Sequence, residues 1–462
     1  MDASTRNLGE GAKSSDTLHI ARWLTRSSPN SDSHARATTR LSLIDFLGCS
    51  ISASGTGDAK VVADRLCVPG EVPALGHPGK NLHPASAAYL HAWQAHAFEM
   101  DDGDWDTWGH LGSPTIAAAL SAGWYADATV AELTDAVSMA FSFGMALGRA
   151  VNPGHYGRGF CTTGTIGTLT AAAVSVRLLG LDEASAAYAL DFAVAQAAGV
   201  RQFALDGSAS CLIIPANAAR AGLESATLAA SGLLGGKEAI DGDLGFLRVL
   251  GGTAGLLPTI AMSDGNLDGI YFKSHSCCGN AIGPLHAFIQ AWKDLGCPRL
   301  QQVHFELPKE VARNVNHPNP SIELERHLSL QLAVAMHLVH GGIEARDLID
   351  LEISMEVSQL MGTVGISVLE PDHSHELDNG KIGFITLLTS DGRSVRQQVP
   401  ALGPPLRDLE ISRKFKALVE PSLGKIHADQ LLSVLSDGST PVRDILKIGQ
   451  RQTEFNRLEI RL

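Results

Sequence analysis

Residues 98–114 (FEMDDGDWDTWGHLGSP) concentrate side chains that can exchange protons or bind a cation. The segment contains one histidine, His110, and no lysine or arginine. Carboxylates this close together repel one another, and a solvated loop would not usually carry two tryptophans as well. Three functions are therefore open: a metal site, an acid–base site, or an exposed acidic loop. The acidic residues are Glu99, Asp101, Asp102, Asp104 and Asp106, and the tryptophans are Trp105 and Trp108.

The metal interpretation rests on Asp104 and Asp106, because an Asp-x-Asp pair can supply oxygen ligands. The longer calcium-loop pattern with its glycine and closing glutamate is missing, so we expect no metal. The acid–base interpretation rests on His110. A nearby negative charge raises the pKa of a histidine, so the carboxylates would keep His110 protonated near neutral pH, as a general acid requires.

A second segment, residues 154–167 (GHYGRGFCTTGTIG), combines glycines and threonines and runs into a long apolar stretch. Backbone amides at the start of a helix hold anions, although the G-K-[ST] signature of a P-loop is missing. The segment is therefore either a ligand site or a helix-entry loop. At such a helix start Cys161 would have a lowered thiol pKa, unless it is a buried inert cysteine. His155, Arg158 and Thr163 stand where a ligand would meet the helix.

A third segment, residues 271–279 (YFKSHSCCG), stands where the character of the chain changes. Ligands usually lie in clefts between domains, and a lysine at such a junction can neutralise a substrate carboxylate. Lys273, with His275 beside it, is therefore a candidate substrate-binding residue, and the alternative is a surface lysine. The adjacent Cys277 and Cys278 lack the C-x-x-C spacing of a zinc site.

The bulk composition limits the classes of partner. The 49 acidic and 36 basic residues give a formal charge of −13 without a Lys/Arg-rich block, so we expect neither nucleic acid nor membrane as a partner. No apolar run approaches the roughly 20 residues of a membrane span, and the polar N-terminus lacks the apolar core of a signal peptide. Seven cysteines at irregular spacing indicate a reducing compartment, and we expect a cytoplasmic protein.

Apolar patterns predict that the N-terminal half of the chain is mainly helical. These stretches are rich in alanine and glycine and apolar on most sides, which is typical of helices buried in a large helical assembly. The predicted helices are 38–49, 87–97, 130–148 with Thr129 as N-cap, 165–179, 182–198 and 216–234.

The pattern changes after about residue 265, where strands are predicted at 303–307, 350–356 and 381–390. An Asp391-Gly392 turn makes 395–399 the hairpin partner of the last of these, and 329–340 reads as a helix. Two further helices, 412–419 and 428–435, should pack back on the first domain. The predicted domains are a disordered N-terminus at 1–17, a helical domain formed by 18–265 and 401–462, and an α+β domain at 266–400.

Taken in order, these segments resemble the MmgE/PrpD family, which contains 2-methylcitrate dehydratase, cis-aconitate decarboxylase and iminodisuccinate epimerase. The likeness covers nearly the whole chain and depends on the order and spacing of four stretches. These are LSLIDFLGCSISASG, HAWQAHAFEMDDGDWDTWGHLGSP, GFCTTGTIGTLTAAAVSVRLLGL and FKSHSCCG.

The resemblance implies a mainly α fold: a large all-helical domain with a smaller α+β lid domain. It also implies a homodimer, an active site between the domains, and no metal or organic cofactor. Carried over to this sequence, Glu99 and Asp102 fall on acidic positions that orient and charge His110. His110 falls on the first catalytic histidine, and Lys273 on the junction lysine that binds a substrate carboxylate.

Two departures from the family pattern bear on the substrate. Cys161 stands where the family carries a second histidine, and Cys211 stands where it carries a lysine. Burying an unpaired polyanion is prohibitive, so the loss of these groups favours a less charged or more apolar substrate. Arg158 and Arg201 are candidates for replacement charge.

The sequence therefore predicts a cofactor-independent lyase or isomerase that transfers a proton next to a carboxylate or carbonyl of a small carboxylic acid. Elimination, decarboxylation and epimerisation all remain open. One alternative is a family member redirected to a less charged substrate of specialised metabolism. Another is a non-catalytic relative that retains only the fold.

Overall fold

The computed structural model describes residues 15–27, 32–251, 267–343, 347–349 and 352–451. Most of the segment predicted to be disordered, together with the predicted domain boundary at 265/266, lies outside these residues. The prediction for its last residues is wrong, because Asp16 and Thr17 belong to helix α1 (Asp16–Arg26). Ser15 caps this helix by accepting a hydrogen bond from the Thr17 amide at 3.2 Å.

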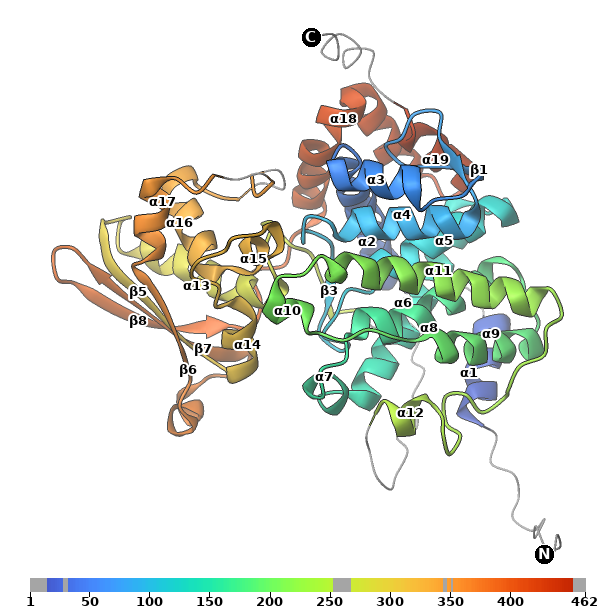
Figure 1. Cartoon of the computed structure of the whole chain (residues 1–462), viewed down its shortest axis with the longest axis horizontal. Helices are drawn as coiled ribbons and strands as arrows, with labels where there is room; N and C mark the ends of the chain where they lie inside the picture. Colours follow the sequence, from blue (N-terminus) through green and yellow to red (C-terminus); the bar gives the residue numbers. More distant parts are fainter. Residues whose placement is uncertain (1–14, 28–31, 252–266, 344–346, 350–351, 452–462) are drawn as a thin grey trace, which may run out of the picture.

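The protein is mainly α-helical, as predicted, and most of its helices form one body (Figure 1). We call this part, with the two short antiparallel strand pairs attached to it, the helical body. Its helices are α1, α2 (Ser33–Ala53), α3 (Gly57–Arg65), α4 (Pro84–His96), α5 (Gly112–Ala126), α6 (Val130–Val151), α7 (Gly154–Gly157), α8 (Thr162–Leu178), α9 (Glu183–Gln196), α10 (Phe203–Asp206), α11 (Ser210–Ala230), α12 (Phe246–Val249), α18 (Asp408–Ser436) and α19 (Val442–Gly449). Its strand pairs are β1 (Pro69–Pro73) with β2 (Asn81–Leu82) and β3 (Gly103–Asp104) with β4 (Ile270–Tyr271).

Helix α6 shows how the sequence starts and buries these helices. Thr129 is the predicted N-cap, and the structure completes a capping box in which Thr129 and Glu132 satisfy each other's backbone amides. The helix has the length and hydropathy of a membrane span, with a mean hydropathy of 1.3 in its most apolar window. The expectation that no segment reaches that length is therefore wrong. Because 89% of this window is buried inside the protein, α6 fits the central helix of a helical core.

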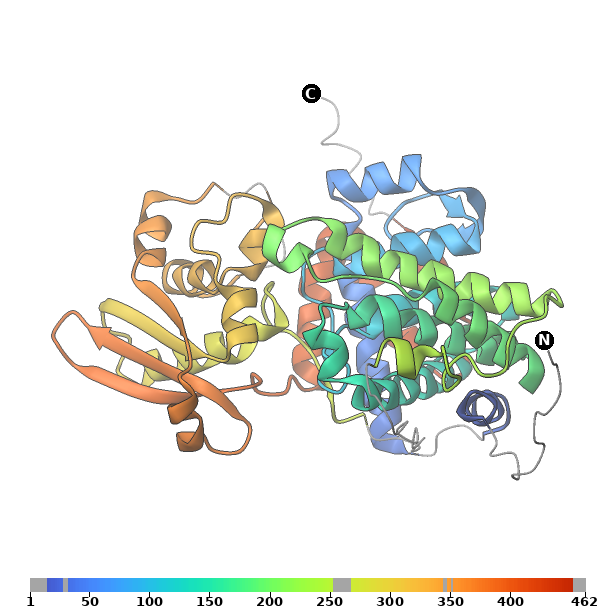
Figure 2. The ribbon, with the colours of Figure 1, turned by 60° about the horizontal axis from the view of Figure 1, so that its bottom comes forward.

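The second part, which we call the α+β part, is a mixed sheet covered by helices (Figure 1, Figure 2). Strand order is β6-β5-β7-β8; β6 runs parallel to β5, whereas β5/β7 and β7/β8 are antiparallel. At the centre Phe305 pairs with Ile366 on one side and Ile385 on the other. The elements are α13 (Gly279–Asp294), β5 (Leu300–Leu307), α14 (Lys309–Val315), α15 (Glu323–Leu328), α16 (Leu330–His340), α17 (Met355–Met361), β6 (Val364–Val368), the 3-10 helix η1 (Pro371–Glu376), β7 (Lys381–Thr389) and β8 (Ser394–Pro400).

The predicted strand at 350–356 is wrong where the structure describes it. Residues 352–354 are not paired, and α17 begins at Met355. The reason is local: the Ser354 hydroxyl accepts a hydrogen bond from the Val357 amide at 3.2 Å and so starts a helix. The fourth strand is instead β6, which the sequence reading did not predict.

Each of the two parts has its own large hydrophobic core. One core runs from Ile20 to Phe272 and takes in Ile411 to Leu446, so the C-terminal helices pack into the helical body. The other runs from Cys277 to Val399 within the α+β part. The two predicted tail helices are merged in α18, which is kinked at Gly424 (φ 76°). Because ligands usually bind between domains, we expect a binding cavity at the boundary between the two parts.

Candidate active site

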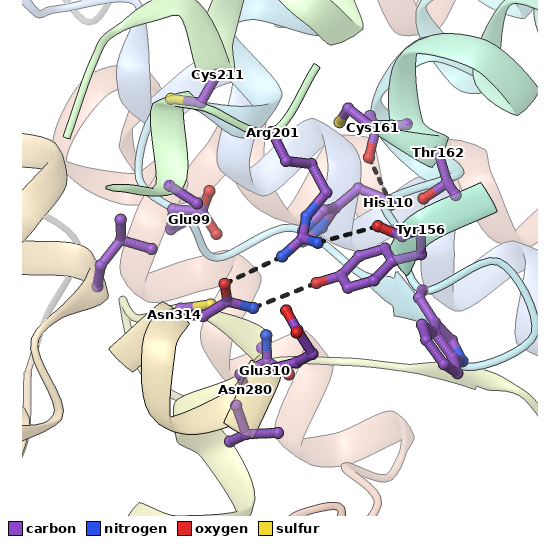
Figure 3. Close-up of a pocket in the computed structure, with 18 of the residues that line it drawn as sticks. Glu99, His110, Tyr156, Cys161, Thr162, Arg201, Cys211, Asn280, Glu310 and Asn314 are labelled. Carbon is purple, nitrogen blue, oxygen red and sulfur yellow. Dashed lines mark hydrogen bonds between the residues drawn. The ribbon is translucent and has the colours of Figure 1, made fainter. Parts of the chain in front are cut away.

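A cavity of about 450 Å³ opens between the helical body and the α+β part (Figure 3). The acidic segment, the start of α8 and the α10–α11 region form its walls on one side. The starts of α13 and α14 and the end of α15 face them from the other. The residues that line it include His96, Glu99, Asp104, Trp105, Trp108, His110, Tyr156, Cys161, Thr163, Arg201, Phe203, Cys211, Tyr271, Cys278, Asn280, Lys309, Glu310, Val311, Asn314 and Leu328.

The short β3–β4 pair brings two distant predicted segments together at this cavity. Gly103 pairs with Tyr271 and Asp104 with Ile270, so the acidic segment lies against the junction that precedes the α+β part. A side chain at position 103 would not fit, because a Cβ there would lie 2.3 Å from the Tyr271 ring. The glycine therefore permits the close pairing that positions Lys273 next to the carboxylates.

His96, which the sequence reading did not single out, is buried between two carboxylates at the end of α4. Its Nδ1 lies 3.0 Å from both Asp101 carboxylate oxygens, and its Nε2 lies 3.2 Å from Glu99 Oε1. Burial opposes a charge on this ring, but the negative charges of Asp101 and Glu99 outweigh it and raise the pKa of His96 to about 10. His96 is therefore an imidazolium at neutral pH.

His110 lies beside His96, with ring centroids 4.7 Å apart, but has the opposite protonation state. Its Nδ1 is 2.7 Å from the Asp102 backbone oxygen, which only accepts, so Nδ1 carries the proton. Burial, together with the Lys273 and His96 charges, outweighs Asp101 and lowers the pKa of His110 to about 4. The prediction of a protonated His110 is thus wrong: the ring is neutral, and Nε2 has no protein partner among the described residues.

Asp102 does not charge His110 through its carboxylate, as the sequence reading expected. The carboxylate points to the α5 start, where the Gly112 amide donates to Oδ1 at 3.2 Å. Burial and the neighbouring Asp45 and Asp101 carboxylates raise the pKa of Asp102 well above its usual value. Only its backbone oxygen orients His110, and the carboxylate nearest that ring belongs to Asp101, at 3.5 Å from Nδ1.

Lys273 is fully buried and does not line the cavity, which differs from its predicted role as a substrate cation. Its Nζ donates to the Glu99 backbone oxygen at 2.8 Å and to Oε2 at 3.0 Å. Burial disfavours an ionised Glu99, but Lys273 and His96 outweigh it and lower the pKa of Glu99 well below its usual value. Lys273 therefore holds Glu99 as an anion, and Glu99 is already shared between two cations.

Arg201 is the predicted cation that does reach the cavity. Its guanidinium lies over the Tyr156 ring, 3.4 Å from the centroid. One Nη donates to the Tyr156 backbone oxygen at 3.4 Å and the other to Asn314 Oδ1 at 3.0 Å. Figure 3 shows this chain continuing from Asn314 to the Tyr156 hydroxyl, at 3.3 Å. Since Asn314 belongs to α14, these contacts link the α+β part to the helical body across the cavity.

The cavity also contains Cys161, Cys211 and Thr163 from the predicted set. Cys161 is the N-cap residue of α8, yet burial raises the pKa of its thiol, which agrees with the alternative of a buried inert cysteine and not with a lowered pKa at the helix start. Burial also raises the pKa of Cys211 well above its usual value. Both thiols are neutral. Thr163 accepts a hydrogen bond from the His110 amide at 3.0 Å and so helps to fix that residue.

Three predicted binding residues lie away from this cavity. His155 is fully buried, with Nδ1 2.8 Å from the Leu250 oxygen and Nε2 2.8 Å from Thr165 Oγ1. Arg158 is exposed and donates to the same Leu250 oxygen. His275 borders a different hollow, beside residues 402–406. Tyr156 follows His155 in the chain, and Cys278 lies three residues after His275. Both line the cavity, and neither was selected from the sequence as a binding residue.

His96, Glu99 and His110 each offer a ligand atom, and these atoms lie within 4.8 Å of one another. A metal would need a lone pair on each imidazole. Both nitrogens of His96 instead point at carboxylates, an arrangement that requires a proton on each. The charges of His96 and Lys273 further oppose an added cation. The three residues therefore fit a cluster that holds protons better than a metal site.

Comparison with known proteins agrees with the resemblance seen in the sequence. The family model of the MmgE/PrpD N-terminal domain matches residues 18–257, just over half of the chain. A search of curated proteins found no significant match. The matched region contains His96, Glu99 and His110 and all the helices from α2 to α12. The chain therefore belongs to the MmgE/PrpD family, whose members are generally lyase-type enzymes.

Proposed function

We propose that the protein is a cofactor-independent lyase or isomerase that transfers a proton at a carbon next to a carboxylate or carbonyl. The observation that carries this proposal is His110. It is neutral at neutral pH, its Nδ1–H is held by the Asp102 carbonyl, and its Nε2 is left for a ligand in the cavity. A general base requires this combination of a fixed tautomer and a free lone pair.

In this proposal His110 Nε2 removes the proton from the carbon acid. The electron pair left behind spreads onto the adjacent carboxylate or carbonyl, where negative charge develops. Arg201 lines the cavity and has no carboxylate partner among the described residues, so it is the cation available to stabilise that charge, and a charge in a buried site acts more strongly than in water. The charge of His96 is shared with Asp101 and Glu99. His96 acts on His110 instead, because its positive charge helps to keep the neighbouring ring neutral. The intermediate then loses a leaving group or carbon dioxide, or takes a proton back, depending on the substrate.

Asp101 and Glu99 act through His96, and Lys273 acts through Glu99. They keep the charge of His96 in place and fix the ring, so we regard them as positioning residues. A small carboxylic acid as substrate, the absence of a metal or organic cofactor, and a homodimer are parts of the same proposal.

Proton transfer at carbon can be measured without knowing which reaction follows it. The protein is incubated in D₂O with methylcitrate, cis-aconitate, citrate and aromatic monocarboxylates, and ¹H NMR follows the loss of C–H signals next to the carboxylates. We expect exchange in at least one acid for the wild type. His110→Gln should lower that rate about 100-fold or more, because a general base contributes about 10²- to 10⁴-fold.

The matched control is His34→Gln, since His34 is exposed and pairs with Asp268 outside the cavity. It should exchange at the wild-type rate, and both variants should melt close to the wild-type temperature. Exchange that survives in His110→Gln, or no exchange of any acid by the wild type, would contradict the proposal and favour a non-catalytic relative.

A further inference from the structure

We propose that the substrate carries one carboxylate, bound by Arg201, on a flat apolar or aromatic body. This inference rests on the proposed function and specifies the substrate class of the same cavity. Three features of the cavity carry it: the number of uncompensated cations, the geometry of Arg201, and the nature of the walls.

Among the described residues that line the cavity, Arg201 is the one half-buried cation that has no carboxylate partner. His96 is already compensated by Asp101 and Glu99. Lys309 is exposed at the mouth and is followed in the chain by another lining residue, the acidic Glu310. The cavity interior can therefore neutralise one carboxylate well, and a second has no comparable partner.

Arg201 is held ready for such a carboxylate. Stacking on Tyr156 and the hydrogen bond to Asn314 fix the plane of the guanidinium. These contacts, with the one to the Tyr156 backbone oxygen, use two of its five N–H groups, so the others remain for a ligand. A planar group with a fixed orientation loses little freedom when it binds a carboxylate.

Acidic side chains on the other walls of the cavity disfavour a substrate with several carboxylates. Glu99 is an anion, and Glu310 points toward the same space in Figure 3. Asp104 also lines the cavity, although burial raises its pKa to about 6. Cys161 and Cys211 add only neutral thiols. A second or third carboxylate would therefore meet negative charge or apolar surface instead of a cation.

The rest of the lining is suited to a flat apolar group. Two aromatic pairs belong to it: Trp108 meets Tyr156 edge-on with centroids 5.1 Å apart, and Trp105 lies 5.2 Å from Tyr271. Aromatic walls bind aromatic or planar ligand surfaces through burial and ring contacts. Phe203, Val311 and Leu328 extend this surface toward the α+β part.

The test measures binding of four probes to the full chain by isothermal titration calorimetry: 3-phenylpropionate, its amide, succinate and propane-1,2,3-tricarboxylate. We expect 3-phenylpropionate to bind about tenfold or more tightly than each of the other three. The amide lacks the charge that strengthens the hydrogen bonds to Arg201, and a charge-assisted hydrogen-bond pair is worth at least that factor. The two polyacids bring further carboxylates that have no cation in the cavity. In Arg201→Gln the acid and the amide should bind equally. Arg220→Gln, on the exposed side of α11 and outside the cavity, should keep the wild-type preference.

The comparison of acid and amide in the wild type needs no variant, so a folding defect cannot imitate the result. Tighter binding of either polyacid, equal binding of acid and amide, or no binding of 3-phenylpropionate at millimolar concentration would overturn the inference. Exchange of a polyacid that depends on His110 would then leave the proposed function standing. The expected binding preference without any exchange would instead retain the ligand class and remove the reaction.

Discussion

His96 and His110 lie next to the same acidic residues, yet His96 is protonated and His110 is neutral. The difference follows from where each carboxylate points. Asp101 contacts Nδ1 of His96 directly, and Glu99 contacts Nε2. His110 contacts a neutral backbone oxygen at 2.7 Å and a carboxylate only at 3.5 Å. Since desolvation falls on both rings, the direct ion pairs decide the outcome. A neutral ring with a fixed tautomer can act as the general base in proton abstraction next to a carboxylate.

The two histidines should therefore titrate far apart. ¹⁵N NMR of histidine-labelled protein should show an imidazolium that persists to about pH 9, which is His96. Several rings should stay neutral to about pH 5, among them His77, His91 and His275, and one of these should be the Nδ1–H ring of His110. The pKa of His96 is raised from 6.5 to about 10 on folding, so its contribution to stability is complete below pH 6.5 and is lost as the pH rises toward 10. The pKa of His110 is lowered to about 4, so its contribution is present above pH 6.5 and is lost as the pH falls toward 4.

His110→Gln assigns the His110 signal among the neutral rings, because that signal alone should disappear from the spectrum. Titration of both His96 and His110 near pH 6.5 would contradict the geometry of the cluster. So would a stability that rises between pH 7 and pH 10 as a result of His96.

At the scale of elements, close helix packing places the start of α8 beside α11 at the cavity. Small residues make this possible. Gly222 of α11 faces α8 so closely that a Cβ there would lie 2.5 Å from Ala171 Cβ and 2.6 Å from the Thr168 oxygen. On the neighbouring turn of α8, a Cβ at Gly164 would lie 2.7 Å from Cγ2 of Ile214 in α11. The glycines therefore set the spacing of the helices that carry Cys161 and Cys211.

Gly222→Ala should destabilise the protein by about 1–3 kcal/mol, the usual cost of overpacking a close helix contact. Thermal unfolding followed by circular dichroism measures the change. Gly57→Ala is the control, because nothing lies within 4 Å of a Cβ at that position in α3. Its melting temperature should equal or slightly exceed that of the wild type. Equal effects of the two substitutions would show that α8 and α11 are not in close contact.

At the scale of the whole molecule, the C-terminal helix α18 contacts both helix α2 and the backbone of the acidic segment. Lys414 Nζ lies 2.6 Å from Asp45 Oδ1 of α2, and both side chains are buried. Lys414 also donates to the backbone oxygen of Met100, the residue before Asp101. One buried ion pair therefore joins the C-terminal helix α18 to helix α2 near the N-terminal end, next to the backbone of the acidic segment.

Lys414→Met should destabilise the protein by about 3–5 kcal/mol, because it leaves the Asp45 carboxylate buried without its cation. Urea denaturation measures the loss. The double variant Asp45→Leu/Lys414→Met should recover much of it, since apolar replacement of a buried pair is often tolerated. Lys416→Met is the control on the same helix: its pair with Asp429 is exposed, so little change is expected. A double variant no more stable than Lys414→Met would contradict this account of the pair.

The sequence by itself determined the elements and the neighbourhood of the site. Apolar periodicity and caps such as Thr129 depend on residues near one another in the chain, and the helical segments were predicted on that basis. The same holds for the hairpin of β7 and β8. Five residues selected from the sequence line one cavity: His110, Cys161, Thr163 and Cys211 from the segments that resemble the family, and Arg201, selected as a candidate for replacement charge.

Only the tertiary structure decided the protonation of those residues and which of them face a ligand. Asp101 and Asp102 are neighbours in the chain, yet one carboxylate contacts His96 and the other turns to α5. Lys273 is paired with Glu99 and so does not face a ligand. Asn314 of α14, which no sequence signal marked, accepts a hydrogen bond from Arg201 and helps to fix it. Charge and pKa depend on burial and on contacts of a few ångströms between distant segments, and spacing along the chain does not specify them.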